Sequence, residues 1–137
     1  MWRPSSGTWF ILTTTTAYGS SITRQFGLNG DIPLVIDFDH DGRMDFAVYR
    51  PSTGAWYSQD ALLATTSVGS PFNVQWGTSA DLPVPHDFDG DGWADLTVFR
   101  PSTGEWWIVR STTGTGVVVS WGTPLDVPML RTGYSRP

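Results

Sequence analysis

The chain contains three copies of one sequence pattern, and this repetition constrains its fold more than any other feature. The segment Arg3–Trp9, RPSSGTW, recurs as Arg50–Trp56 and as Arg100–Trp106, so the period is 47 to 50 residues. Two further markers follow each copy in the same order: Gln25–Gly27, Gln75–Gly77 and Ser120–Gly122, then Asp31–Pro33, Asp81–Pro83 and Asp126–Pro128. A pattern that returns at a fixed period of this length predicts a repeat architecture built from similar supersecondary units.

Each unit predicts four short strands separated by turn residues. Thr, Ser, Gly, Pro and aromatic residues dominate the chain and lysine is absent, which favours strands and turns over helices. We expect strands at 34–37, 45–50, 55–59 and 72–76 in one unit, and at 84–87, 94–100, 105–110 and 117–121 in the next. Such a four-stranded antiparallel meander, repeated at this period, is typical of a β-propeller blade. The predicted class is therefore all-β, with three propeller blades per chain.

The position at which the repeats are cut predicts self-association. Met1–Arg3 matches the end of the strand that finishes at Arg50, and Val127–Leu130 matches the first strand of a unit. We therefore expect one repeat domain, 1–137, with complete blades at 32–77 and 82–122 and a third blade divided between 1–31 and 123–137. Since a closed propeller typically needs at least four blades, three should not close alone.

The expected solution is a homodimer in which the C-terminal strand of one copy completes the N-terminal blade of the other. Two copies would then form a six-bladed ring around a two-fold axis. The alternatives are a piece of a longer repeat array and a larger oligomer with a wider channel.

Two acidic loops join the first and second predicted strands of the complete blades. Asp37–Asp45 (DFDHDGRMD) and Asp87–Asp95 (DFDGDGWAD) both carry carboxylates at positions 1, 3, 5 and 9 and glycine at position 6. Four carboxylates so close together repel one another unless a cation offsets their charge, and Ca²⁺ prefers six to eight oxygen ligands in flexible geometry. Mg²⁺ requires stricter octahedral geometry, and Zn²⁺ lacks its usual Cys and His ligands here. The alternative is a plain acidic turn.

We expect two calcium ions per chain. The predicted ligands of the first are Asp37, Asp39, Asp41, the carbonyl of Arg43, and Asp45. Those of the second are Asp87, Asp89, Asp91, the carbonyl of Trp93, and Asp95. The third unit has Thr132 where the other units have the first aspartate, so no third site is expected.

The order of these motifs resembles the FG-GAP (VCBS-type) repeat. The residues that carry the resemblance are Phe26-Gly27 or Trp76-Gly77, the Asp-Ile-Pro or Asp-Leu-Pro turn, and the loop Asp-Phe-Asp-x-Asp-Gly-x-x-Asp. That repeat builds the calcium-bearing propeller of integrin α-subunit heads and occurs in secreted bacterial proteins and integrin-like fungal lectins. The resemblance implies an extracellular or cell-surface protein, with a calcium loop between the first two strands of a blade.

Charge and composition exclude several classes of function. Eight of the 13 acidic residues lie in the two loops, and the remaining five face eight dispersed arginines, so no nucleic-acid partner is expected. The chain has no cysteine and no 18-residue apolar run, and its N-terminus has no apolar signal-peptide segment. We expect no enzyme, because the clustered carboxylates serve as metal ligands and both histidines, His40 and His86, lie in or beside the loops.

The recurring aromatic residues are expected to fill the space between blades. These residues are Trp9, Trp56 and Trp106 at one position and Phe26, Trp76 and Trp121 at another. The recurring Arg3, Arg50 and Arg100 are interpreted as structural, stacking on aromatic rings or bonding loop carbonyls. Trp93 and Trp107 do not recur and are candidate ligand-binding residues, with glycans as the expected ligand.

Three functional hypotheses follow from these features. The first is a non-enzymatic, calcium-stabilised binding or assembly module, whose partner is a second copy or another protein ligand. The second is a carbohydrate-binding propeller with sites between blades. The third is a scaffold segment of a larger secreted adhesin or enzyme.

Overall fold

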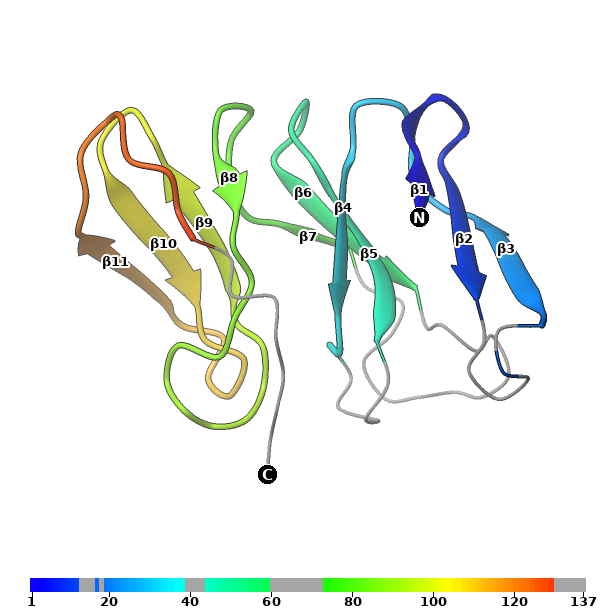
Figure 1. The fold of residues 1–137 in the computed structure, drawn as a ribbon. Helices are drawn as coiled ribbons and strands as arrows, with labels where there is room; N and C mark the ends of the chain where they lie inside the picture. Colours follow the sequence, from blue (N-terminus) through cyan, green and yellow to red (C-terminus); the bar gives the residue numbers. More distant parts are fainter. Residues whose placement is uncertain (13–16, 18, 39–43, 60–72, 130–137) are drawn as a thin grey trace. The chain divides into compact units, whose positions relative to one another are not determined.

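A computed structural model describes residues 1–12, 17, 19–38, 44–59 and 73–129, and its secondary structure is almost entirely β (Figure 1). The chain divides into two compact units, Met1–Ser79 and Ala80–Pro137. The first unit holds a three-stranded and a four-stranded sheet, and the second holds one four-stranded sheet. Besides strands, the described residues form one short 3-10 turn, Pro4–Ser6, and they contain no helix that could cross a membrane.

All strand pairs are antiparallel and follow the order of the chain. The first sheet contains β1 (Trp2–Arg3), β2 (Thr8–Leu12) and β3 (Ser21–Gln25). The second contains β4 (Ile32–Ile36), β5 (Asp45–Arg50), β6 (Ala55–Gln59) and β7 (Asn73–Gln75). The third contains β8 (Leu82–Pro83), β9 (Leu96–Arg100), β10 (Glu105–Val109) and β11 (Gly116–Ser120). Four-stranded meanders are thus confirmed for both complete units.

The first strand of the third sheet is shorter than predicted. A strand at 84–87 was expected, whereas β8 covers only Leu82–Pro83, and His86 forms an isolated bridge with Asp95. Pro85 explains this difference, because proline has no N–H to donate to a sheet, whereas the corresponding residue of the full-length strand β4 is Val35. Val84 lies just before Pro85 and still donates its N–H to the carbonyl of Thr97, at 2.8 Å.

The repeated tryptophan occupies the same place in all three sheets. Trp9 lies opposite Trp2, Trp56 opposite Tyr49, and Trp106 opposite Phe99. In each sheet its indole N–H donates to the carbonyl of the aromatic residue after the last strand; these carbonyls belong to Phe26, Trp76 and Trp121, at 2.7–2.9 Å. In the two four-stranded sheets this side chain therefore ties the third strand to the end of the fourth, and in the first sheet it ties β2 to the end of β3. Trp9 and Trp56 are buried, and Trp106 is half-buried.

The repeated arginine lies above an aromatic ring of the next strand. Arg3 stacks on Phe10, Arg50 on Tyr57 and Arg100 on Trp107, with the guanidinium carbon 4.3–4.6 Å from the ring centroid. Arginine is well suited to this position because its planar, weakly hydrated guanidinium stacks on aromatic faces. The structural interpretation of these arginines is thus confirmed.

Two of these arginines, which are half-buried, also form an ion pair with a buried aspartate of the Asp-x-Pro marker. Arg50 Nε donates to Asp31 Oδ1 and its second guanidinium nitrogen donates to Asp31 Oδ2, both at 2.9 Å. Arg100 binds Asp81 with the same two contacts at the same distances. Hydrogen bonding to Asp31 raises the pKa of Arg50 above its ordinary value, so the guanidinium is charged at every pH below the ordinary arginine pKa.

The core of the first unit lies between its two sheets. Trp9 of β2 is only 5% exposed and its ring lies 5.2 Å from that of Phe46 on β5. Val48 completes the buried cluster, and Trp2, Ile11, Phe26 and Tyr57 pack around it. The prediction that the repeated tryptophan fills the space between neighbouring sheets is confirmed at Trp9.

The glycine of each Pro-Ser-x-Gly turn is required by close packing of the backbone. Gly54 and Gly104 have φ values of 68° and 70°, which L side chains rarely adopt. A Cβ at either position would overlap the carbonyl oxygen of the glycine after the fourth strand, Gly77 or Gly122 respectively. These contacts bring the turn after the second strand against the end of the fourth, at one end of the sheet.

Candidate metal site

Asp95, the last residue of the second acidic loop, is fully buried at the start of β9. One carboxylate oxygen accepts the N–H of Phe88 and the other accepts the N–H of Ser111, both at 2.9 Å. Phe88 belongs to the acidic loop and Ser111 to the turn between β10 and β11. The carboxylate of Asp95 therefore fastens together two connections that lie at the same end of the third sheet.

Asp87, the first residue of the loop, accepts hydrogen bonds from the backbone of the glycine-rich part of the loop. Its two carboxylate oxygens accept the N–H groups of Gly90, at 2.6 Å, and Gly92, at 2.9 Å. Both glycines have positive φ, 83° and 91° respectively. The glycine at position 6 thus allows the chain to turn sharply and to direct its N–H back to the first aspartate.

Three carboxylates of the loop meet. Asp87, Asp89 and Asp95 each offer an oxygen, and these oxygens all lie within 4.8 Å of one another. Ligands that bind one Ca²⁺ at about 2.3–2.6 Å are separated by no more than about 5 Å, so the observed spacing fits a shared calcium ion. The donors are oxygens alone, which favours a hard cation over zinc. These residues would hold calcium and would have their mutual repulsion neutralised by it.

Asp91 and Trp93 take other positions in the loop. Asp91 is not in the group of three: one of its oxygens accepts the N–H of Trp93 at 2.6 Å, and the other accepts the hydroxyl of Ser111 at 2.8 Å. The side chain of Trp93 is 41% exposed. The structure thus brings together Asp87, Asp89 and Asp95 and uses Asp91 to bridge the loop and the neighbouring turn.

Two residues of that turn were not singled out from the sequence. Ser111 binds Asp91 and Asp95, and the hydroxyl of Thr112 lies 3.4 Å from an oxygen of Asp89. A signal for them exists, because in a four-stranded meander the first and third connections lie at the same end of the sheet. The polar run Ser111–Thr113 occupies that third connection.

The first acidic loop repeats the part of this arrangement that can be compared. Asp45 is buried at the start of β5, and its carboxylate accepts the N–H of Phe38 at 3.0 Å, as Asp95 does from Phe88. Asp37 is half-buried. The other predicted ligands, Asp39, Asp41 and Arg43, lie outside the described residues.

Trp107, a candidate ligand-binding residue, has structural contacts on one face and at its polar end. Arg100 stacks on its ring, and its indole N–H lies 3.3 Å from a carboxylate oxygen of Glu105. Phe10 and Tyr57 take the same place under Arg3 and Arg50. Trp107 therefore provides a platform for the repeated arginine.

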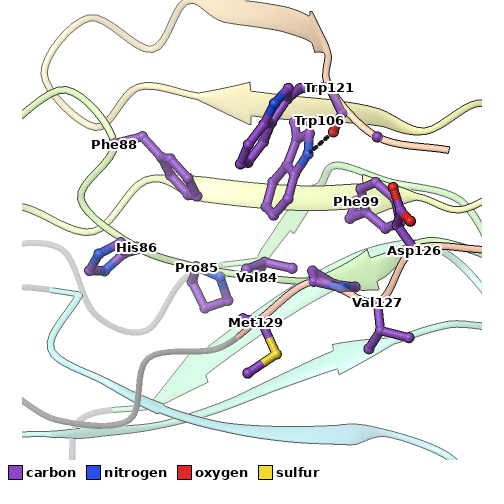
Figure 2. A pocket seen from close by; sticks show the side chains of 12 residues that line it. Val84, Pro85, His86, Phe88, Phe99, Trp106, Trp121, Asp126, Val127 and Met129 are labelled. Atoms are coloured by element: carbon purple, nitrogen blue, oxygen red, sulfur yellow. Dashed lines mark hydrogen bonds between the residues drawn. The ribbon is translucent and has the colours of Figure 1, made fainter.

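An apolar groove of about 690 Å³ lies on the face of the third sheet that carries Trp106 (Figure 2). Phe99, Trp106 and Trp121 line it from the sheet, and Val127 and Met129 line it from the segment after the last strand. Trp121 is 75% exposed. The groove is therefore lined mainly by apolar side chains.

One comparison with known protein families finds a match in the central part of the chain. Residues 37–98 match the model of the FG-GAP-like repeat family. The match begins at the first residue of the first acidic loop and ends three residues beyond the second loop, inside β9. No curated protein and no solved structure matches the chain. The segment that carries both acidic loops is thus similar to the FG-GAP-like repeat, as the order of its motifs predicted.

Proposed function

We propose that the chain is a non-enzymatic, calcium-stabilised binding or assembly module of the β-propeller type that works outside the cell. The observation that carries the proposal is the meeting of Asp87, Asp89 and Asp95 within 4.8 Å. All three stand where the first strand of a sheet passes into the second, so a cation there would strengthen the sheet itself. The FG-GAP-like match of residues 37–98 supports this assignment.

The charge balance of the loop supports a structural role for the metal. Carboxylates held this close repel one another, and the fully buried Asp95 adds to the energy of keeping them together. A divalent cation converts this repulsion into attraction in the folded state alone. At free calcium about 1,000 times the dissociation constant, the stabilisation is about 4 kcal/mol per site. Extracellular calcium, at millimolar concentration, reaches this level for a micromolar site.

Removal of calcium is expected to lower the melting temperature by at least about 10 °C. The measurement is a thermal unfolding curve in millimolar calcium, repeated with excess chelator. Magnesium at the same concentration is the matched control and should restore only a small part of the shift, because it requires octahedral geometry. An unchanged midpoint after chelation would show that the loops hold no calcium in the native protein.

Carbohydrate binding is the second candidate function. The observation that favours it is the exposed indole of Trp121, beside Trp106 at a ring-centroid distance of 6.4 Å, at the edge of the groove. Aromatic faces of this kind could stack on sugar rings. A broad glycan array, probed with wild-type protein and with Trp121→Ala, tests it. Binding that depends on Trp121 would support a lectin, and no binding across the panel would remove this candidate.

A further inference from the structure

Two charged residues near opposite ends of the sequence occupy positions that form ion pairs in both complete repeats. Arg3 corresponds to Arg50 and Arg100, and Asp126 corresponds to Asp31 and Asp81. Arg3 and Asp126 are both exposed, and neither has an ion-pair partner among the described residues.

Both residues are nevertheless held in the conformation that the paired copies use. Arg3 stacks on Phe10 at 4.6 Å, as Arg50 stacks on Tyr57 at 4.4 Å. Asp126 accepts the N–H of Thr123 at 2.7 Å, as Asp31 accepts that of Leu28 at 2.8 Å. Each half of a third ion pair is therefore preorganised for the group that it lacks.

The segments that carry Arg3 and Asp126 correspond to two strands that pair with each other in the complete sheets. In the complete sheets the first strand pairs with the second, with Ile32 opposite Tyr49 and Leu82 opposite Phe99. β1 corresponds to that second strand, but among the described residues only β2 pairs with it. The same register would place Val127 opposite Trp2 and Pro128 opposite Met1. Residues 126–129 form no strand in the structure and line the groove with exposed apolar side chains.

The groove on the third sheet is the counterpart of a surface that is covered in the first unit. Around Gly27, the nearest side chains are those of Trp2, Asp31 and Val48, and Val48 comes from the neighbouring sheet. Around Gly122, the three nearest atoms belong to the counterparts Phe99 and Asp126 and to the carbonyl of Gly104, and no counterpart of Val48 is among them. In the repeat alignment Met1 is the residue that corresponds to Val48.

We propose that a second copy of the chain supplies the missing partner of Arg3 and the missing partner of Asp126, so that two copies exchange their ends. The segment Asp126–Met129 of one copy pairs with β1 of the other, and Asp126 binds the partner's Arg3 through two hydrogen bonds. The partner's Met1 then packs against Trp106 in the groove of Figure 2. Each copy gives one end and receives one, so a two-fold axis closes the assembly as six sheets. The inference rests on the proposed β-propeller-type module, whose partner it names.

The lining of the groove favours a protein partner over a sugar. Most of its lining is apolar, including Val84, Pro85, Phe99, Trp106, Val127 and Met129. The ionisable side chains in the lining are those of His86 and Asp126, fewer polar groups than usually orient a sugar. The same surface of the first unit is covered by the side chains of a neighbouring sheet. The described residues form three sheets, fewer than the four or more that a closed propeller typically contains.

Charge reversal at the two ends tests the proposal. In millimolar calcium, sedimentation of the wild-type chain should give twice the 15.1 kDa of one chain. Arg3→Asp and Asp126→Arg should each weaken the dimer by on the order of 100-fold or more, because like charges then face each other at two buried sites. An equimolar mixture of the two variants should restore a dimer, since both interfaces again join opposite charges. Ser52→Asp, on an exposed turn of the first unit, is the control for added charge and should remain dimeric.

The mixture distinguishes an ion pair between copies from an ion pair within one chain, and the mass of the restored complex distinguishes a dimer from a larger oligomer. The doubly reversed chain, Arg3→Asp with Asp126→Arg, should also dimerise. Recovery in the doubly reversed chain without recovery in the mixture would overturn the proposal, because the pair would then lie within one chain. A wild-type chain that stays at 15.1 kDa at all concentrations would overturn it too, and glycan binding by that monomer would assign the groove to carbohydrate. Calcium uptake measured on the same samples keeps failure of the dimer separate from failure of the metal site.

Discussion

Replacing Arg100 with methionine is expected to lower the free energy of unfolding by about 3–5 kcal/mol. The substitution leaves the carboxylate of Asp81, whose side chain is 0% exposed, without the two hydrogen bonds at 2.9 Å that compensate its burial. A buried charge that loses its partner retains its desolvation penalty, which makes this loss far larger than that of a surface ion pair. Methionine retains an apolar chain over the ring of Trp107, so the measured loss reports chiefly on the ion pair.

The matched control removes both charges. Asp81→Asn combined with Arg100→Met leaves no buried charge unpaired and should recover a large part of the lost stability. Urea unfolding of the wild type, the single variant and the double variant gives the comparison. A single-variant loss below about 1 kcal/mol would mean that the pair behaves as an exposed one, and would also weaken the argument for its counterpart at Arg3 and Asp126.

Asp95→Asn is expected to destabilise the protein both with and without calcium. In excess chelator the loss should be about 2–4 kcal/mol, because the amide offers one oxygen in place of the two that accept the N–H groups of Phe88 and Ser111. In calcium the loss should be larger, since Asp95 is also one of the three clustered carboxylates. Chemical unfolding under both conditions separates the two contributions.

Asp89→Asn is the control for this experiment. Asp89 belongs to the same cluster but is exposed, and its contacts to the N–H of Asp91 and the hydroxyl of Thr112 are long, at 3.3 and 3.4 Å. The substitution of Asp89 should remove most of the calcium-dependent stability. In chelator it should not lower stability, because it removes one of the three carboxylates that repel one another. Equal behaviour of the two variants in chelator would contradict the structural role assigned to Asp95.

The repeat period predicted the sheets well because turn residues mark the strand ends. β5 and β6 have the predicted bounds, since the Pro-Ser-Thr-Gly turn at 51–54 separates them without ambiguity. The predicted strand at 84–87 was displaced because Pro85 interrupts the ladder after Val84. The alternation of residue types predicts a strand, but it does not show where a proline removes an N–H that the sheet needs.

The ion pairs were missed, although their signal is present in the sequence. Asp31 and Arg50 are 19 residues apart, and Asp81 and Arg100 are separated by the same distance. The two residues were treated as separate markers, one in a turn and one at a strand end. Only the antiparallel register of the first two strands brings them together, with Ile32 opposite Tyr49 and Leu82 opposite Phe99.

The carboxylates of the acidic loop were predicted to be equivalent metal ligands, whereas in the structure each makes different hydrogen bonds. Asp87 folds the loop through its glycines, Asp95 ties the loop to the β10–β11 turn, and Asp91 bridges to Ser111. The spacing of the aspartates shows only which carboxylates are near one another along the chain. The hydrogen bonds of each oxygen depend on the neighbouring turn, which spacing in the loop does not describe.

A calcium titration of the metal-free wild-type chain, followed by calorimetry, tests the central proposal most directly. The proposal predicts saturable binding of two ions per chain in the presence of excess magnesium, and loss of one of the two in Asp87→Asn, which changes a ligand of the second loop alone. Absence of saturable binding, or an unchanged binding curve in Asp87→Asn, would contradict the assignment of the acidic loops as calcium sites.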